Sequence, residues 1–150
     1  MPRKRSIDHA PPTNPLVRPM LTDMYQLTMA YAYWRNGIHQ SPAVFDLFFR
    51  KCPFGGAFAI FAGLSEALRF LEHFSFKKND IEYAQTLLPD ADPQFFIWLR
   101  KVNARSIRVF APPEGTIMFP RVPLLTITGP LAICQLLETT LLNLVNYPSL

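Results

Sequence analysis

The sequence has few of the residues from which metal centres, disulfide frameworks and nucleotide-binding loops are built. Its two cysteines, Cys52 and Cys134, form no CxxC pair, and its three histidines are scattered. No His or Cys stands at the spacing of metal ligands, so we predict no metal site and two reduced thiols in a cytosolic protein. No GK[ST] follows Gly55-Gly56, which excludes a P-loop and indicates a turn.

Charge and long hydrophobic runs are also scarce, which excludes two further classes of protein. Charged residues make up 17% of the chain, and residues 1–19 carry +3 of the net charge of +4. The remaining residues hold 11 basic and 10 acidic side chains, without the broad basic face of a nucleic-acid-binding protein. The most apolar long segment, 131–147, is too short and too polar for a membrane helix. Prolines follow the basic amino terminus, so no signal peptide is predicted.

Apolar and aromatic residues, by contrast, are abundant. Hydrophobic residues make up 49% of the 150 positions, and they include 13 Phe and five Tyr. A chain of this length forms one domain that would bury about 68–70% of its unfolded surface. Because the rings are many for this length, we expect some of them to face a partner or a further part of the same protein.

The hydrophobic pattern and the turn residues predict an α+β domain. We expect helices at 23–36, 64–74, 79–88, 93–98 and 130–146, and strands at 43–50, 57–62, 106–111, 116–119 and 124–128. The second strand is expected to return beside the first, after the turn at Pro53–Gly56.

Several residues are expected to set the ends of these helices. The pairs Asp23–Gln26 and Asn79–Glu82 have the spacing of capping boxes. Asp92-Pro93 combines a cap with a first-turn proline. Pro148 is expected to end or kink the last helix near Tyr147.

The first helix and the first strand carry the candidate ligand-binding residues. The helix is apolar on every face, which predicts burial on all sides and hints at a subunit interface. Tyr25 offers a flat ring for stacking on an aromatic acid, or it is one more core tyrosine. Arg50 presents a planar fork that matches phosphate oxygens and Lys51 adds a point charge, or both form a solvated strand end. Asp23 is expected mainly to cap the helix.

Four sequence blocks, in order between Met20 and Leu150, resemble the amino-terminal part of nicotinate phosphoribosyltransferase. These blocks are TDMYQLTMAYAYW, FDLFFRKCPFGGAF, FPRVPLL and GPLAICQLLETTLLNLVNY. The resemblance implies that Tyr25 stacks on nicotinate across a dimer interface. It implies that Arg50 contacts the phosphates of phosphoribosyl pyrophosphate from the neighbouring subunit. Asp23 and Lys51 receive minor ligand-side roles.

The resemblance also implies a fold and a domain division. The fold is the amino-terminal α+β domain of a type II phosphoribosyltransferase-like enzyme, which leads into an irregular α/β barrel. We expect a flexible basic, proline-rich arm at 1–19 and the α+β domain at 20–130. A helix at 131–150 is expected to lead into a barrel that lies outside this chain. Gln135, Glu138, Thr139 and Asn146 fall near one side of this helix, and such a polar stripe either lines a site or bonds neighbouring loops. We expect these groups mainly to organise the junction with the barrel.

The function implied is the first step of NAD synthesis from nicotinate, in a cytosolic homodimer. Nicotinate and phosphoribosyl pyrophosphate give nicotinate mononucleotide, coupled to ATP, with Mg²⁺, through a phosphorylated histidine in the barrel. That histidine has no counterpart here, so we expect no catalytic residue, no bound cofactor and no activity from this chain alone. Neither nucleic acid nor membrane is expected as a partner.

Another class of function stays open beside the enzyme. The chain could be a non-catalytic short form that pairs with the full-length enzyme through the Tyr25 helix and modulates it. Binding of nucleic acid through the basic arm is a third, weaker interpretation.

Overall fold

The computed structural model describes residues 9–150, so the basic run Arg3–Arg5 of the expected arm lies outside the described residues. The elements, in chain order, are α1 (Met24–Arg35), β1 (Pro42–Leu47), η1 (Pro53–Gly55), β2 (Ala59–Ile60), α2 (Leu64–Glu72), α3 (Lys78–Leu87), α4 (Pro93–Leu99), β3 (Arg108–Phe110), β4 (Ile117–Met118), β5 (Leu125–Pro130) and α5 (Leu131–Ser149). The α+β class predicted from the sequence is confirmed.

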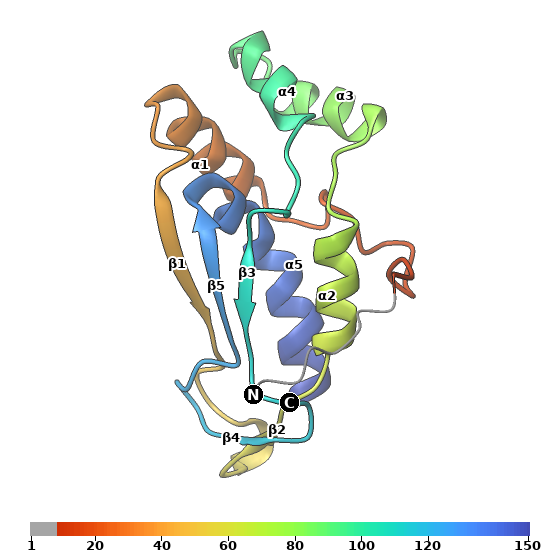
Figure 1. Cartoon of the computed structure of the whole chain (residues 1–150), viewed down its shortest axis with the longest axis vertical. Coiled ribbons are helices and arrows are strands. Elements are labelled where there is room, and N and C mark those ends of the chain that lie inside the picture. Colours follow the sequence, from red (N-terminus) through yellow and green to blue (C-terminus); the bar gives the residue numbers. More distant parts are fainter. Residues whose placement is uncertain (1–8) are drawn as a thin grey trace.

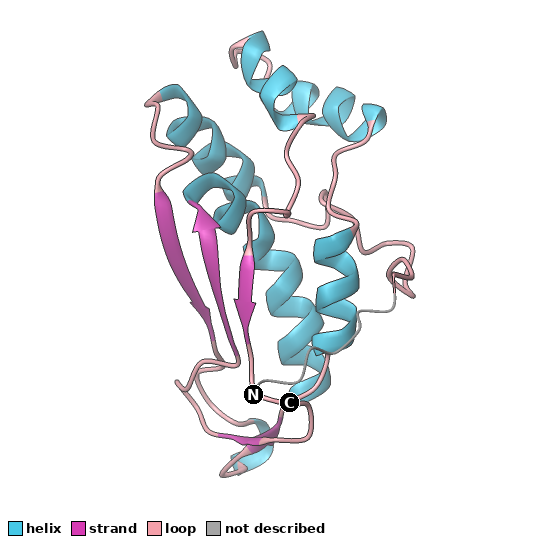
Figure 2. Cartoon of the chain, viewed as in Figure 1, coloured by secondary structure: helices cyan, strands magenta, loops and turns pink. Residues whose placement is uncertain are grey.

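A three-stranded antiparallel sheet in the order β1-β5-β3 forms one layer of the fold. Ile127 at the centre of β5 lies opposite Phe45 of β1 on one side and opposite Val109 of β3 on the other. Figure 1 shows α5 running along one face of this sheet, with α2 beside it. Figure 2 shows α3 and α4 as a helical pair beyond the end of the sheet.

The expected return of residues 57–62 beside the first strand is wrong. The short strand β2 pairs with β4 in a separate two-stranded sheet, in which Ala59 lies opposite Met118. The place next to β1 is taken by β5, whose Leu125 and Ile127 bury their side chains. Sheet pairing is stabilised chiefly by the burial of side chains. The six-residue β5, in which buried side chains alternate with half-buried ones, therefore gains more from pairing with β1 than the two-residue β2 would.

The last helix, α5, is the centre of the core. Its buried side chains contact α1, α2, β1 and β5, and ten of its 19 residues are buried. Its contacts with β1 and β5 continue the packing across residue 130, and the domain division expected there stays a prediction. The helix also continues through Pro148 to Ser149, so it does not end near Tyr147, and the alternative of a kink there stays a prediction. The Ser149 hydroxyl contacts the backbone N–H of Ala62 at 3.0 Å, which ties this end to the turn before α2.

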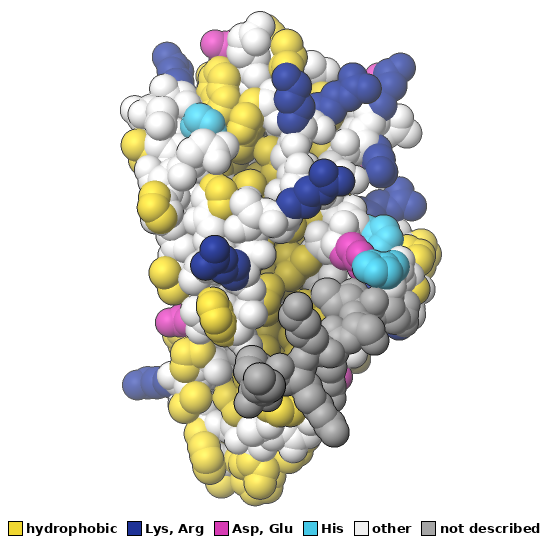
Figure 3. Space-filling view, viewed as in Figure 1, with side chains coloured by type: hydrophobic (Ala, Val, Ile, Leu, Met, Phe, Trp, Pro, Cys, Tyr) yellow, Lys and Arg dark blue, Asp and Glu magenta, His cyan; other side chains and the backbone are white. Residues whose placement is uncertain are grey.

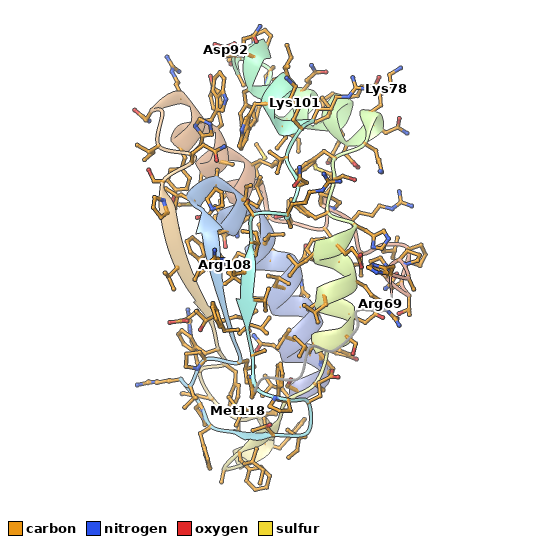
Figure 4. All side chains as sticks on the ribbon, in the orientation of Figure 1. Arg69, Lys78, Asp92, Lys101, Arg108 and Met118 are labelled. Atoms are coloured by element: carbon orange, nitrogen blue, oxygen red, sulfur yellow. The ribbon has the colours of Figure 1, made fainter. Side chains whose placement is uncertain are left out.

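The expected helix caps are only partly observed. Asp23 occupies the N-cap position of α1, but its side chain caps no backbone N–H. The α3 helix begins earlier than predicted, and the backbone N–H of Lys77 donates to Asp80 Oδ2 at 2.7 Å. The cap at Asp92 (Figure 4) is confirmed, since its carboxylate accepts the N–H of Gln94 at 2.8 Å. Thr139 binds the Asp23 carboxylate in place of the first expected box, and the earlier start of α3 makes Asp80, not Glu82, the partner of the N-cap backbone.

The prediction that α1 is buried on all sides is wrong for this chain. One face, with Gln26, Leu27 and Ala30, is buried toward α5. Met24 and Tyr25 are 43% and 45% exposed. The helix therefore presents an apolar face outward as well as inward.

Residues 9–19 lie against α2. The backbone N–H of Thr13 donates to Glu66 Oε2 at 2.9 Å, and His9 contacts Glu72. Burial alone would raise the pKa of Glu66, but hydrogen bonds from Thr13 and the ion pair with Arg69 outweigh it and lower that pKa. His9 and Thr13 of the expected arm thus contact α2, and the flexibility of the arm stays a prediction.

Apolar side chains gather at the end of the molecule that carries β2 and β4, as Figure 3 shows. The exposed residues there are Phe54, Phe58, Ile60, Ile117 and Phe119. They agree with the expectation that part of the aromatic surface faces something beyond this chain, and what covers them stays a prediction. Among residues 9–150, no helix is both long and apolar enough to cross a membrane.

We predict that Gly63 cannot be replaced without a loss of stability. It has φ +89°, and a Cβ atom there would lie 2.0 Å from the backbone oxygen of Leu144 in α5. Gly115 has φ +88° with open space around it, which makes Gly115→Ala the matched control. Gly115→Ala should cost about 1–2 kcal/mol from backbone strain alone. Gly63→Ala should cost about 1–3 kcal/mol more, because the added methyl overpacks the contact with α5.

Urea denaturation of both variants measures the difference. Equal losses of unfolding free energy would mean that α5 moves away from the turn at no cost, contrary to its place in the core.

Candidate functional site

A cavity of about 730 Å³ opens between the end of β1 and the second half of α5. Its lining consists of Phe45, Asp46, Leu47, Phe48, Phe49, Arg50, Lys51, Leu125, Ile127, Glu138, Leu141, Leu142, Asn146 and Leu150. Mostly apolar walls with a few charged groups are typical of sites for small organic ligands.

Arg50 and Lys51 supply the positive charge of this cavity. They stand three and four residues after the end of β1, and both are exposed. The backbone before them is fixed, because Phe49 is buried and its carbonyl oxygen accepts the N–H of Arg121 at 2.8 Å. Within residues 9–150 neither cation forms an ion pair. They are therefore free to bind an anionic ligand.

Tyr25 connects to the cavity through Glu138. Its phenol donates to Glu138 Oε1 at 2.9 Å, and Glu138 lines the cavity although Tyr25 does not. Partial burial, followed by the hydrogen bond to Glu138 and its negative charge, raises the pKa of Tyr25. The phenol thus stays protonated and its ring stays partly accessible.

Polar side chains of α5 join Asp23 and Gln26 to the same network. The Thr139 hydroxyl donates to Asp23 Oδ2 at 2.8 Å, so this carboxylate is bound to α5 instead of capping α1. Gln26 donates to Thr139 Oγ1 at 3.3 Å and contacts Gln135. Three of the four polar residues of α5, Gln135, Glu138 and Thr139, therefore bind α1 within this domain, and their role at a junction with a barrel stays a prediction.

Sequence reasoning missed the role of Glu138 in this site. It noted a polar stripe on α5, and that stripe was the available signal. Its partner is Tyr25, 113 positions earlier in the chain, and the hydrophobic pattern does not show which helix faces the stripe. Asn146 of the same stripe lines the cavity, and its buried Oδ1 has no hydrogen-bond partner within the described residues.

The described residues do not fit a metal ion. No group of three or more His, Cys, Asp or Glu side chains among residues 9–150 is placed to hold one. Cys52 and Cys134 are free thiols, and burial raises the pKa of Cys134 to about 11.

The chain folds as an α+β domain whose cavity carries two cations, Arg50 and Lys51, at one end. A family model described as the nicotinate phosphoribosyltransferase (NAPRTase) N-terminal domain matches residues 20–146. The chain therefore belongs to this family of amino-terminal domains.

Curated relatives and a solved structure support the same assignment. The chain is 57% identical over 136 residues to a nicotinate phosphoribosyltransferase of Caenorhabditis elegans, covering 90% of this chain and 24% of that protein. It is 52% identical over 141 residues to the human protein of that name, covering 93% and 26%. The crystal structure of human nicotinic acid phosphoribosyltransferase matches with a TM-score of 0.79 at 52% identity, over 86% of this chain and 26% of that one. The chain spans about a quarter of the length of these relatives.

We predict that Gln135 stabilises the contact between α1 and α5. Gln135→Leu keeps the approximate volume but leaves the buried Gln26 without its amide partner, which should cost about 1–3 kcal/mol of unfolding free energy. Gln85→Leu, on the exposed surface of α3, is the matched control and should change stability by about 0.5 kcal/mol or less. Denaturant unfolding of the two variants compares them. A Gln135→Leu variant as stable as the control would show that the network contributes nothing to stability.

Proposed function

We propose that this chain is the amino-terminal domain of a nicotinate phosphoribosyltransferase. In the reaction, the nicotinate nitrogen attacks the anomeric carbon of phosphoribosyl pyrophosphate and pyrophosphate leaves. The product is nicotinate mononucleotide, the first intermediate of NAD synthesis from nicotinate. Coupling to ATP, with Mg²⁺, belongs to the same proposal and is assigned to parts of the enzyme beyond this chain.

The observation that carries the proposal is the placement of two unpaired cations at one cavity. Negative charge develops on the leaving pyrophosphate, and Arg50 and Lys51 are suited to stabilise it. The arginine fork matches phosphate oxygens with two parallel hydrogen bonds. Because no carboxylate among the described residues neutralises either cation, binding does not require an ion pair to break first.

Tyr25 is proposed to bind the base. Its ring is partly exposed, its hydroxyl is bound to Glu138, and an offset stack on a pyridine ring would contribute about 0.5–1.5 kcal/mol beyond burial. Asp23 and Lys51 have minor roles, the first by holding the start of α1 to α5. The work of these residues is to position substrates rather than to form or break bonds.

We further propose a cytosolic homodimer in which each subunit completes its partner's site. The exposed apolar side of α1, with Met24 and Tyr25, is suited to an isologous contact. Such a contact would explain why this helix is apolar on faces that the domain itself does not bury.

A chimera tests the proposal. This chain would replace the matching amino-terminal quarter of the Caenorhabditis elegans relative, and nicotinate mononucleotide formation would be measured. The chimera should be active, whereas the isolated chain should form no product. Tyr25→Ala should raise the KM for nicotinate about tenfold, from lost stacking and burial. Arg50→Ala should raise the KM for phosphoribosyl pyrophosphate about tenfold or more.

Tyr83→Ala and Arg100→Ala serve as matched controls, because both side chains are exposed on α3 and at the end of α4, away from the cavity lining. Both should leave the two KM values unchanged. If Tyr25→Ala and Arg50→Ala behave like these controls in an active chimera, the proposed roles are wrong.

A further inference from the structure

Glu138 is held in a fixed orientation by both of its carboxylate oxygens. Oε1 accepts the phenol proton of Tyr25 at 2.9 Å, and Oε2 accepts Gln135 Nε2 at 3.0 Å. Gln135 lies one turn earlier on α5, which places the two side chains on the same face of the helix. The carboxylate therefore cannot turn without giving up one of two hydrogen bonds.

Gln135 is in turn oriented by buried partners. It is 3% exposed, and its Oε1 accepts the Tyr33 hydroxyl at 3.4 Å. Its Nε2 also contacts Oε1 of Gln26, which is fully buried. If the Gln135 side-chain amide were flipped, its NH₂ group would face the Tyr33 hydroxyl and its oxygen would face the Glu138 carboxylate, so the hydrogen bond to Glu138 would be replaced by repulsion. Gln135 therefore donates to Glu138, and Glu138 accepts the proton of the Tyr25 phenol.

Tyr25 needs such support because packing does not hold it. It lies in the first turn of α1 with 45% of its surface exposed. An exposed ring changes rotamer freely unless its far end is bound. Stacking requires a defined ring plane, and small misplacements of a binding group are costly.

We propose that Glu138, oriented by Gln135, is a positioning residue that fixes the Tyr25 ring in the plane that stacks on the base. This inference rests on the proposed role of Tyr25. A purely structural Glu138, which only joins α1 to α5, would contribute to stability without changing the binding of one substrate more than that of the other.

Kinetics of the chimera separate these two roles. Glu138→Ala and Tyr25→Phe remove the same hydrogen bond from its two ends, so each should raise the KM for nicotinate about tenfold. The KM for phosphoribosyl pyrophosphate should change by less than about twofold, since Tyr25 is not proposed to contact it. The double variant should be no worse than either single variant, because the shared bond is already absent. Multiplied effects, or equal rises in both KM values, would overturn the inference.

A titration of the 150-residue chain supplies a readout that does not depend on activity. The phenol absorbance of wild type minus that of Tyr25→Phe isolates the ionisation of Tyr25. The groups that influence its pKa are Glu138, Asp23 and Thr139, and removal of the Glu138 charge and acceptor should lower that pKa. If Glu138→Ala does not fold, Glu138→Gln keeps the shape, removes the charge and should lower the pKa as well. Glu82→Gln, on the exposed side of α3, is the charge-matched control and should leave it unchanged.

The outcomes distinguish the two proposals. An unchanged Tyr25 titration in the Glu138 variants, with base binding still lost in Tyr25→Ala, would overturn the positioning role and leave the proposed function intact. A shifted titration, with a Tyr25→Ala chimera that binds nicotinate normally, would refute the role of Tyr25 and the positioning inference together.

Discussion

The contact between α1 and α5 is the constraint on which the rest of the site depends. It places two amides, Gln26 and Gln135, inside an otherwise apolar interface with Leu27 and Leu137 among the neighbouring buried residues. Burying an amide is costly unless its donors and acceptors are used, and here they are bound to Thr139, Glu138 and each other. A shift of α1 along α5 would break several of these bonds at once. The network therefore sets the axial position of α1, and with it the position of Tyr25, more sharply than apolar packing would.

The other half of the site is positioned by different elements. The apolar faces of α5 and of the sheet pack together, and Leu47 and Phe49 run into this core at the end of β1. Backbone hydrogen bonds from Leu124 and Arg121 hold this segment, so the chain leaves the core at a defined point. Arg50 follows immediately. A rigid backbone that carries flexible cations is suited to phosphate binding, because the main chain fixes where the charges stand while the side chains adapt.

The sequence allowed local structure to be predicted better than long-range pairing. The strand expected at 43–50 is present as β1, although it ends at Leu47, and the helix expected at 23–36 is present as α1, with Gly37 at φ +73° just beyond its end. The cap at Asp23 failed because Thr139, 116 positions away, binds the carboxylate. The last helix was expected from the family resemblance to lead into a barrel, which stays a prediction, and the sequence pattern did not show that within this chain it is enclosed by α1, α2 and the sheet. Tyr25 and Arg50 were singled out largely through a family resemblance, whereas Glu138 required the structure, because its partner lies on another helix.

The charges of the site are segregated rather than paired, and this has a chemical consequence. Glu138 and Asp23 are bound to neutral donors, and Arg50 and Lys51 have no acidic partner among the described residues. Pairing Glu138 with Arg50 would have neutralised both, and a phosphate would then have to displace a carboxylate before binding. Because the carboxylate is instead held by Tyr25 and Gln135, the cationic end of the cavity is ready for an anion without rearrangement.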